Sequence, residues 1–500
     1  MLIEEFSGNH IENKDIIFDL HYGSSIGLSG LKNAVTRAIS YFEVEVGLKS
    51  ADKVALFLEN SLDYVIIFLA LLETEAIIVP LNPKLNKEKL EFYLRHSEAR
   101  LLITSEECLK KNAWLRDLEI RALLAEDVIK ASAALSAGAV LRGPDLLSKD
   151  SAKFIFYTSG TTGNPKGVVL SGRAVKNKII SLVGLLRLSP SEAFFSFLPF
   201  YSGHGLIPGM LVPLLSGCRM YIERFDPFLV PRFWESVKTH GIGYFTSVPS
   251  ILTLLKEQGR GLKKEDVPAL KYIFSASAAL PEGTCAWFRE SLGLRVRNCY
   301  GLTEAASWIS VSPLTGKDQP ANCVGKAFDS EIAVFNEEGR RLASNDIGEF
   351  WVKGPSNMSG YYKNERETEL CTCAGFIKTG DRGYIDKEGN IFISDRIKNI
   401  IKRSGINITP AEIDQVFLGH EDVIDCASFG VPDKDYGERL VTALVLQNGL
   451  RSQEKYIKYA IDRLPVFLVP NEIIFLDSIP KGPTGKVLVG KLRDDYLNYP

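Results

Sequence analysis

Hydrophobic and polar positions follow two different periods over residues 28–104. Some segments space their apolar residues three or four apart, as one face of a helix does, while others are short apolar runs typical of buried strands. The predicted helices are 28–42, 61–72 and 87–96, and the predicted strands are 54–60, 76–82 and 99–104. Strands joined by helices need crossover connections, so we expect a mostly parallel sheet with helices on both faces.

The same alternation returns over residues 173–300. The predicted strands there are 196–200, 219–222, 244–248 and 271–277, with helical stretches such as 251–258 between them. Residues 105–150 follow neither period, and we expect helix and loop. The longest apolar run, 64–72, is closed by Asp63 and Glu73 and is far shorter than the ~20 residues that span a bilayer, so it predicts a buried helix.

After Val324 the chain changes to shorter β-rich segments punctuated by glycine, at 331–340, 348–354 and 389–395. Residues 409–412, Thr-Pro-Ala-Glu, have capping-box spacing with proline at the first helical position, which predicts the start of a helix. Two strands, a helix over 452–464 and a Gly/Pro-rich loop follow. Together these elements predict an α+β unit of about a hundred residues, the size of a separate domain.

Composition restricts the function more than the fold. The 500 residues carry 59 Lys and Arg against 61 Asp and Glu, a net charge of −2, with 45% hydrophobic and 24% charged residues. This balance is typical of an ordinary globular protein and argues against collagen-like, disordered and nucleic-acid-binding classes. Because the chain has no overall positive field, a bound phosphate has to be held by local geometry.

Eight cysteines are scattered along the chain, unlike the dense disulfide framework of small secreted proteins, so we expect reduced, mostly buried thiols. The one close pair, Cys371 and Cys373, lacks the second pair or nearby histidines of a zinc site. The first ten residues contain no apolar signal core, and no segment has the length of a transmembrane helix. We therefore expect a cytoplasmic enzyme.

A glycine-rich loop at residues 157–167 is the sharpest local feature. It reads Tyr-Thr-Ser-Gly-Thr-Thr-Gly-Asn-Pro-Lys-Gly after an apolar strand, so its amides, hydroxyls and Lys166 are suited to hold a polyphosphate. A Walker A loop is excluded, because Pro165 and Gly167 stand where that motif needs glycine and a magnesium-binding hydroxyl. The alternative is a flexible Ser/Thr/Gly linker.

This loop resembles the phosphate-binding signature of the adenylate-forming superfamily, which includes acyl-CoA synthetases, peptide-synthetase adenylation domains and beetle luciferases. Further motifs of that family follow in its order: Tyr-Gly-Leu-Thr-Glu at 300–304, Gly-Glu-Phe-Trp-Val-Lys-Gly at 348–354, Ser-Gly-Tyr-Tyr at 359–362, Thr-Gly-Asp at 379–381, Asp-Arg at 395–396 with 402–412, and Pro-Thr-Gly-Lys at 483–486. The similarity covers nearly the whole chain.

The resemblance implies an α/β fold in two unequal parts. A large N-terminal domain, 1–394, would consist of βαβ-type subdomains plus a small β-barrel-like part. A small, mobile α+β C-terminal domain, 395–500, would follow a hinge near Asp395.

The resemblance also assigns the chemistry of a nucleotide site. In this family a carboxylate attacks the α-phosphate of ATP and pyrophosphate leaves, and such transfer depends on positioning and neutralised charge. The residues implied to bind the nucleotide are Thr158, Ser159, Gly160, Thr161, Thr162, Gly163, Lys166, Ser277, Ala278, Tyr300, Gly301, Asp381 and Arg396. The implied catalytic residues are Lys486, Glu304, Thr303 and Lys166.

Each role suits the residue type. Lys166 and the hydroxyls of 158–162 would hold the β- and γ-phosphates, and Glu304 would help to coordinate Mg²⁺ through the ATP phosphates. Thr303 would contact the α-phosphate, and Tyr300 would stack on adenine. Asp381 would accept both ribose hydroxyls, since a carboxylate is acceptor-only, with Arg396 holding the ribose from the other domain. Lys486 would bridge the acid and the α-phosphate.

The implied acyl pocket consists of Tyr201, His204, Phe245 and Ser275. The stretches 201–206 and 241–247 are aromatic and apolar, which favours a fatty, aryl or similar neutral-bodied acid. Amino-acid-activating relatives carry an aspartate where Ser202 stands, and a buried ammonium without it would be unpaired, so α-amino acids are not expected. Ala276 and Ala279 also depart from the family pattern, which usually has glycine and proline at these positions.

In the second half-reaction of the family a phosphopantetheine thiol displaces AMP after the small domain rotates. The implied thiol path is Lys402, Ser404 and Gly405, and the hinge is Asp395. The sequence therefore predicts ATP- and Mg²⁺-dependent activation of a carboxylic acid and thioester formation with coenzyme A. The alternatives are loading of phosphopantetheine on a separate acyl carrier protein, and a non-catalytic nucleotide binder. No nucleic-acid partner is expected.

Overall fold

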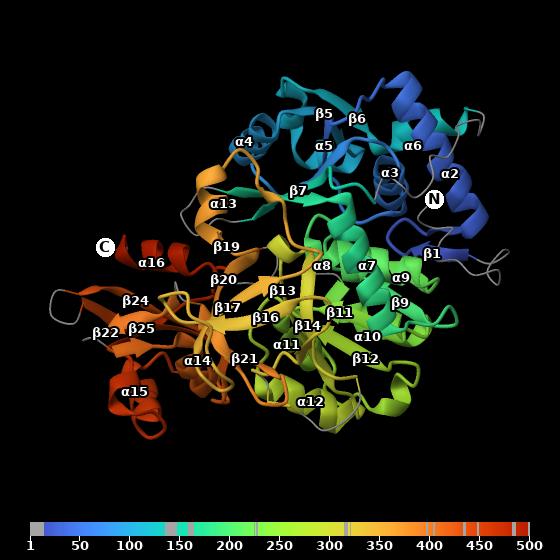
Figure 1. Ribbon diagram of the computed structural model, residues 1–500. Coiled ribbons are helices and arrows are strands. Elements are labelled where there is room, and N and C mark those ends of the chain that lie inside the picture. Colours follow the sequence, from blue (N-terminus) through green and yellow to red (C-terminus); the bar gives the residue numbers. More distant parts are fainter. Residues whose placement is uncertain are drawn as a thin grey trace.

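The computed structural model describes residues 15–498 with short gaps. The residues of that span outside the description are 136–147, 159–164, 225, 227–228, 315–318, 321, 397–398, 404–405, 434–436, 448–449 and 483–486. The described chain forms four β-sheets with helices packed between and around them (Figure 1). Two large sheets form most of the N-terminal part, and two five-stranded sheets follow.

The seven-stranded sheet has the order β18-β8-β7-β4-β3-β5-β6. Its strands are β3 (Lys53–Leu56), β4 (Ile77–Pro80), β5 (Ala99–Thr104), β6 (Arg121–Leu124), β7 (Ala152–Thr158), β8 (Lys166–Ser171) and β18 (Gly360–Tyr361). The strands from β7 to β6 are parallel, and β8 and β18 are antiparallel additions. The β7–β8 hairpin carries the glycine-rich loop, and β18 brings Tyr361 beside it.

The nine-stranded sheet has the order β15-β14-β13-β12-β11-β9-β10-β1-β2. Its strands are β1 (Asp15–Asp19), β2 (Ser24–Gly27), β9 (Ala193–Ser196), β10 (Arg219–Ile222), β11 (Tyr244–Ser247), β12 (Tyr272–Ser275), β13 (Val296–Leu302), β14 (Ser307–Val311) and β15 (Lys326–Ala327). The six central strands are parallel, so the ends of β11, β12 and β13 lie at one edge. That edge is where ligands bind in such sheets.

Helix α3 (Leu62–Leu72) lies between the two large sheets, and all of its residues except Asp63 are buried. Helices α2 (Leu28–Ser40) and α7 (Gly172–Leu186) share this central core, and α6 (Ala125–Ala133) packs on α2 and α3. The outer layers are α4 (Lys87–Ser97) and α5 (Glu106–Lys111) on the seven-stranded sheet, and α10 (Leu229–Thr239), α11 (Pro249–Gln258) and α12 (Glu282–Leu292) on the nine-stranded one. The short helices α8 (Gly203–Leu206) and α9 (Val212–Leu215) flank a π-helical turn between β9 and β10.

The third sheet is antiparallel and has five strands. They are β16 (Glu331–Phe335), β17 (Gly348–Lys353), β19 (Thr372–Cys373), β20 (Phe376–Ile385) and β21 (Ile391–Arg396), with α13 (Glu365–Cys371) before β19. The fourth sheet forms a separate lobe, orange to red in Figure 1. Its elements are β22 (Ile401–Arg403), β23 (Ile406–Ile408), α14 (Pro410–Leu418), β24 (Val423–Asp433), β25 (Gly437–Leu446), α15 (Gln453–Ile461), β26 (Glu472–Phe475) and α16 (Val489–Leu497).

The α/β fold class and most elements predicted from the sequence are confirmed, including the buried helix at 64–72. Three details were wrong. Residues 105–150 contain a strand, β6, in addition to helix. The strand expected at 196–200 is β9, which ends at Ser196, because the buried residues after it form a loop. The helix at 410 begins with proline as predicted, but the side chain of Thr409 makes no capping hydrogen bond.

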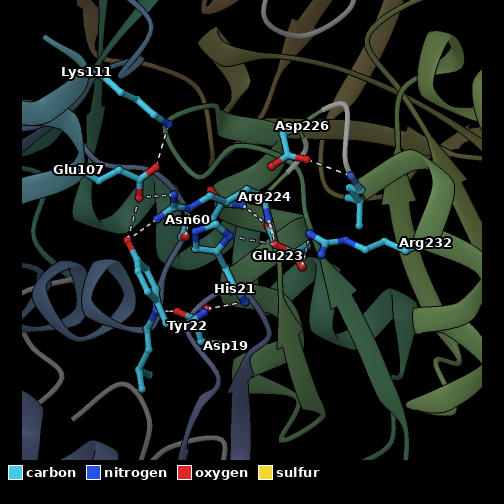
Figure 2. Close-up of polar contacts among 12 residues, drawn as sticks. Asp19, His21, Tyr22, Asn60, Glu107, Lys111, Glu223, Arg224, Asp226 and Arg232 are labelled. Atoms are coloured by element: carbon cyan, nitrogen blue, oxygen red, sulfur yellow. Dashed lines mark hydrogen bonds and ion pairs between the residues drawn. The ribbon is translucent and has the colours of Figure 1, made fainter.

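A polar network joins the two large sheets beside the loop that leads to α8 (Figure 2). Arg224 Nη1 donates to Glu107 Oε2 at 2.6 Å, and its Nη2 donates to the Tyr22 hydroxyl at 2.7 Å. Asn60 donates to Leu198 O at 2.9 Å and accepts from Phe200 N at 2.9 Å. The two Asn60 bonds fix the backbone of residues 198–200, immediately before Tyr201, to the segment between β3 and α3.

All eight cysteines are free and five are buried, which confirms the expected state of the thiols. Among the helices that the structure describes, none is long and apolar enough to cross a membrane.

Candidate active site

Nine consecutive residues, 300–308, connect three clusters of polar side chains. They run from the end of β13 through a short 3-10 helix, Thr303–Ala305, into β14. Tyr300 contacts the first cluster, Glu304 the second and Trp308 the third. The predicted nucleotide and acid residues therefore meet along one segment of chain.

In the first cluster Asp381 is the shared acceptor. The Tyr300 hydroxyl donates to its Oδ2 at 2.7 Å, and Arg396 Nε lies 2.7 Å from its Oδ1. The turn before it is shaped by Gly380, whose φ of +71° favours glycine, and by the Thr379 hydroxyl, which accepts from Asp381 N. Burial and the adjacent carboxylate raise the pKa of Tyr300, so its phenol stays a donor.

Arg396 reaches Asp381 from within the same sheet, because the two residues are paired across β20 and β21. The backbone of Asp395 also belongs to β21. The sheet thus extends through the position expected for the hinge. The sequence predicts that Arg396 reaches the ribose from the other domain, but here Arg396 belongs to the same sheet as Asp381. A turning point near Asp395 stays a prediction.

The second cluster consists of Lys166, Glu304, Tyr361 and Glu367. The Tyr361 hydroxyl donates to Glu304 Oε1 at 2.8 Å, and Lys166 Nζ lies 4.9 Å from the centre of the Tyr361 ring. Lys166 is also ion-paired with Glu367 on α13. Burial and Glu304 raise the pKa of Tyr361, which keeps it a donor to the carboxylate.

Local backbone geometry places these groups. Strand β18 pairs with β8, and Tyr362 N donates to Gly167 O at 2.7 Å, which sets Tyr361 beside the strand of Lys166. A Cβ on Gly301 would lie 2.1 Å from Ser307 O, so only glycine fits there. Ala306 and Ser307 have positive φ of 55° and 110°, a strained turn directly after Glu304.

The third cluster surrounds His204. Its Nε2 is hydrogen-bonded to Thr246 Oγ1 at 2.6 Å and its Nδ1 to Ser277 Oγ at 3.3 Å, and its ring meets the Trp308 indole edge to face at 5.4 Å. Burial lowers the pKa of His204 to about 3, so its imidazole is neutral at physiological pH. Ser277 has a φ of +78°, another strained position at this edge.

Three buried polar groups near this cluster have no hydrogen-bond partner: Ser275 Oγ, Ser307 Oγ and Trp308 Nε1. Unpaired buried donors are uncommon, because each carries its full desolvation cost. They occur at the end of β12 and the start of β14.

A cavity of about 290 Å³ opens next to His204. Its walls come from both parts of the molecule: Asn82, Lys84, Leu198, Pro199, Tyr201, Ser202, His204, Val248, Ile251, Lys481 and Gly482. Lys481 and Gly482 directly precede the Pro-Thr-Gly-Lys motif. Residues 483–486 themselves lie outside the described residues.

The acyl-pocket prediction for Phe245 was wrong. Phe245 is fully buried in the aromatic cluster beneath α10, with its ring 5.2 Å from that of Phe233. Successive side chains of a strand point to opposite faces, and it is the next residue, Thr246, that contacts His204. Tyr201 lines the cavity, Ser275 is buried at the strand end, and Ser202 is held by capping α8.

Several predicted residues are not tested by the geometry. Eight of them lie outside the described residues: Ser159, Gly160, Thr161, Thr162, Gly163, Ser404, Gly405 and Lys486. Thr158 ends β7 opposite Lys166, and Thr303 begins the 3-10 helix. Ala278 is exposed beside Ser277. Lys402 lies in β22, and its backbone amide donates to Glu438. Their roles stay predictions.

Sequence reasoning missed Thr246, Trp308, Tyr361 and Glu367. Tyr361 lies inside a motif that had been recognised, yet nothing in the motif shows that its hydroxyl reaches Glu304. Strand alternation could have favoured Thr246 over Phe245. No local signal marks Glu367, whose partner is 201 positions away in the chain.

No group of three or more His, Cys, Asp or Glu side chains suited to a metal ion occurs among the described residues. Mg²⁺ usually binds through one or two carboxylates plus substrate phosphates, and the Glu304 carboxylate, which shares Tyr361 as a neighbour with Lys166, fits that pattern.

Comparisons with known proteins show the family of the chain. The chain matches the family model AMP-binding enzyme over residues 9–362 and the model AMP-binding enzyme C-terminal domain over 412–486. It is 32% identical to an oxalate–CoA ligase of Arabidopsis thaliana, over 94% of this chain and 93% of that protein. It is 30% identical to a sulfoacetate–CoA ligase of Cupriavidus necator, over 88% and 87% respectively.

Among solved structures, ATP-bound MatB from Rhodopseudomonas palustris superposes with a TM-score of 0.88 at 26% identity and 99% coverage of both chains. The family models span most of the sequence, and the relatives match it nearly end to end. The chain belongs to the AMP-binding enzyme family, the adenylate-forming ligases.

Proposed function

We propose that this protein is an AMP-forming acyl-CoA ligase: it activates a carboxylic acid with ATP and transfers the acyl group to coenzyme A. The observation that carries this proposal is the common attachment of the Asp381, Glu304 and His204 clusters to residues 300–308. The named CoA-ligase relatives support the same reaction.

In the first half-reaction the acid carboxylate attacks the α-phosphate, and both reactants are anions. Lys166 supplies positive charge for the β- and γ-phosphates, and Asp381 accepts from the ribose hydroxyls, with Arg396 alongside. Mg²⁺ on the phosphates would neutralise further charge, and Glu304, oriented by Tyr361, would share in holding it. The ammonium group of Lys486 would contact both the acid carboxylate and the α-phosphate.

The acid is compact. The Trp308 indole, packed on Phe274 and His204, closes the wall at the third cluster, and the unpaired donors beside it suit a polar body. Among the relatives, the acids named include oxalate and sulfoacetate, which are short, and also long-chain fatty acids. We propose a compact acid here, a narrower class than the fatty, aryl or similar neutral-bodied acid that the sequence predicts, and no α-amino acid.

In the second half-reaction the thiol displaces AMP from the acyl-adenylate. Lys402, Ser404 and Gly405 would line its path, and rotation near Asp395 would bring them into place while it withdraws Lys486. A carrier-bound phosphopantetheine has the same thiol, so a separate acyl carrier protein is the second candidate acceptor.

The experiment is pyrophosphate–ATP exchange with oxalate, sulfoacetate, benzoate, 4-coumarate and palmitate. We expect exchange that is highest with the short acids and absent without acid. Exchange with none of these or other acids, by a protein that binds ATP, would refute the ligase reaction; exchange with palmitate alone would refute only the compact pocket. Comparing free coenzyme A with a pantetheinylated carrier then identifies the acceptor.

Lys486→Ala separates the two half-reactions. This variant should lose exchange but still form thioester from a supplied acyl-adenylate, whereas Lys402→Ala should show the reverse pattern. Equal loss of both half-reactions in Lys486→Ala would contradict its assignment.

A further inference from the structure

We propose that Glu367 is an internal competitor of ATP: its carboxylate holds Lys166 in the nucleotide-free protein, and the β- and γ-phosphates must displace it to bind. The proposal rests on the proposed function in one respect, that Lys166 binds the ATP phosphates.

The ion pair between Lys166 and Glu367 is the direct observation. Their side chains are 15% and 32% exposed, so the pair is partly shielded from water. Lys166 Nζ lies over the Tyr361 ring, 4.9 Å from its centre, and donates to the Glu367 carboxylate. Its ammonium group is therefore already neutralised before any phosphate arrives.

Glu367 is held in this position by its surroundings. Asn364 caps α13 by accepting from Glu367 N at 3.1 Å. Tyr361 N donates to Thr368 Oγ1 at 2.8 Å, which ties the helix to β18, and β18 pairs with β8, the strand of Lys166. The carboxylate thus belongs to a connected frame, and its contact with Lys166 is not that of a freely rotating surface pair.

A carboxylate and a phosphate are alternative anionic partners for one ammonium group. If both stayed beside Lys166, the two anions would repel each other at close range in a partly buried site. Binding of ATP therefore has to break the Lys166–Glu367 contact, and part of the binding free energy is spent on this exchange. The same exchange in reverse helps pyrophosphate to leave, because Glu367 pairs with Lys166 again.

The competition acts only on ligands that carry phosphates beyond the α position. ATP and pyrophosphate place the β- and γ-phosphates beside Lys166, whereas AMP has only the α-phosphate and does not reach it. Removing the charge of Glu367 should therefore strengthen the binding of ATP and pyrophosphate and leave the affinity for AMP unchanged. A residue with a merely structural role would change all three affinities together.

The test measures dissociation constants of ATP, pyrophosphate and AMP by calorimetry, with Mg²⁺ and without acid or coenzyme A. For Glu367→Gln, which keeps the shape of the side chain, we expect ATP and pyrophosphate to bind about 3- to 10-fold more tightly, as for loss of a partly exposed ion pair. Glu369→Gln, on the same helix but exposed, is the matched control and should bind all three ligands as the wild type does.

A double-mutant cycle with Lys166→Ala isolates the contact: in that background the gain from Glu367→Gln should be smaller than in the wild type, because only the repulsion between Glu367 and the phosphates is left to remove. Unchanged or weaker binding of ATP and pyrophosphate by Glu367→Gln would overturn the proposal, as would an equal change for AMP. A wild-type protein that binds neither ATP nor AMP would instead refute the proposed function, so the two failures are distinguishable.

Discussion

The hydroxyl of Tyr361 donates a hydrogen bond of 2.8 Å to the carboxylate of Glu304, although 57 residues separate the two in the chain. The bond fixes the orientation of the carboxylate that faces the proposed magnesium–phosphate site. It also leaves the Tyr361 ring beneath the ammonium group of Lys166. One side chain thus positions a cation and an anion of the same site.

Tyr361→Phe removes this bond but keeps the ring. A hydrogen bond to a charged group contributes about 1.5–3 kcal/mol, so we expect adenylation to fall roughly 10- to 100-fold. Pyrophosphate–ATP exchange at varied Mg²⁺ measures the loss. Tyr362→Phe, which removes an exposed hydrogen bond to Glu98 and leaves the Tyr361–Glu304 bond in place, is the control and should stay near wild type. Equal activity of the two variants would contradict the role of Tyr361.

Asp381→Asn tests the ribose contact. The amide presents a donor where two oxygens now accept, and it leaves Arg396 without its carboxylate, so we expect kcat/KM for ATP to fall about 10- to 100-fold. The specific readout is 2′,3′-dideoxy-ATP: wild type should discriminate strongly against it, and the variant should discriminate little. Asp346→Asn, at an exposed turn, serves as control. Undiminished discrimination by Asp381→Asn would show that the ribose lies elsewhere.

His204 makes stability depend on pH. Its pKa is about 3 in the folded protein, against an ordinary value of 6.5. Between these values the unfolded chain binds more protons than the folded one, so stability is lost as pH falls from 6.5 toward 3, by up to about 1.4 kcal/mol per pH unit.

The melting temperature of the wild type should therefore drop more between pH 7 and 5 than that of His204→Asn, which does not titrate. Parallel curves for the two proteins would contradict a buried neutral imidazole. The same variant should also change acid preference, because His204 contacts Thr246, Ser277 and Trp308.

A buried ion pair supports the active-site strand. Lys178 Nζ lies 2.5 Å from Asp329 Oδ2 and donates to Trp308 O at 2.7 Å, and the two side chains are 0% and 2% exposed. Lys178→Met leaves the buried Asp329 carboxylate without its cation, with only the Ser330 and Ser356 hydroxyls as donors among the described residues, which should lower the free energy of unfolding by about 3–5 kcal/mol. Urea unfolding measures this. Lys178→Met with Asp329→Asn should recover part of the loss; no recovery would mean that the pairing is not its cause.

The sequence could predict elements whose period is unambiguous. Helix α3 was identifiable because its own residues are apolar on every face and polar residues close both ends. The glycine-rich loop was identifiable because it combines glycines, hydroxyl side chains and a lysine, the groups that bind phosphate. Motif resemblance identified Glu304, Asp381 and Lys166. Pairing between distant positions, such as Lys166 with Glu367, depends on how β18 joins β8 and leaves no local pattern.

The errors have similar physical origins. Residues 197–200 are apolar because they are buried, but burial does not distinguish a loop under α8 from a strand. Phe245 was assigned to the ligand side because aromatic residues often line acyl pockets, whereas alternation along β11 directs it to the helix side and Thr246 to the ligand side.

The segment 300–308 also limits how such an enzyme can change during evolution. Its strand residues have a side-chain period of two, so inserting or deleting one residue within β13 or β14 would turn the groups beyond that point to the opposite face. Single substitutions at the acid end, near Trp308, leave the spacing between Tyr300 and Glu304 intact. Point substitutions can therefore change which acid is bound and preserve the nucleotide contacts. Changes of length in this segment disrupt the binding of both the acid and the nucleotide.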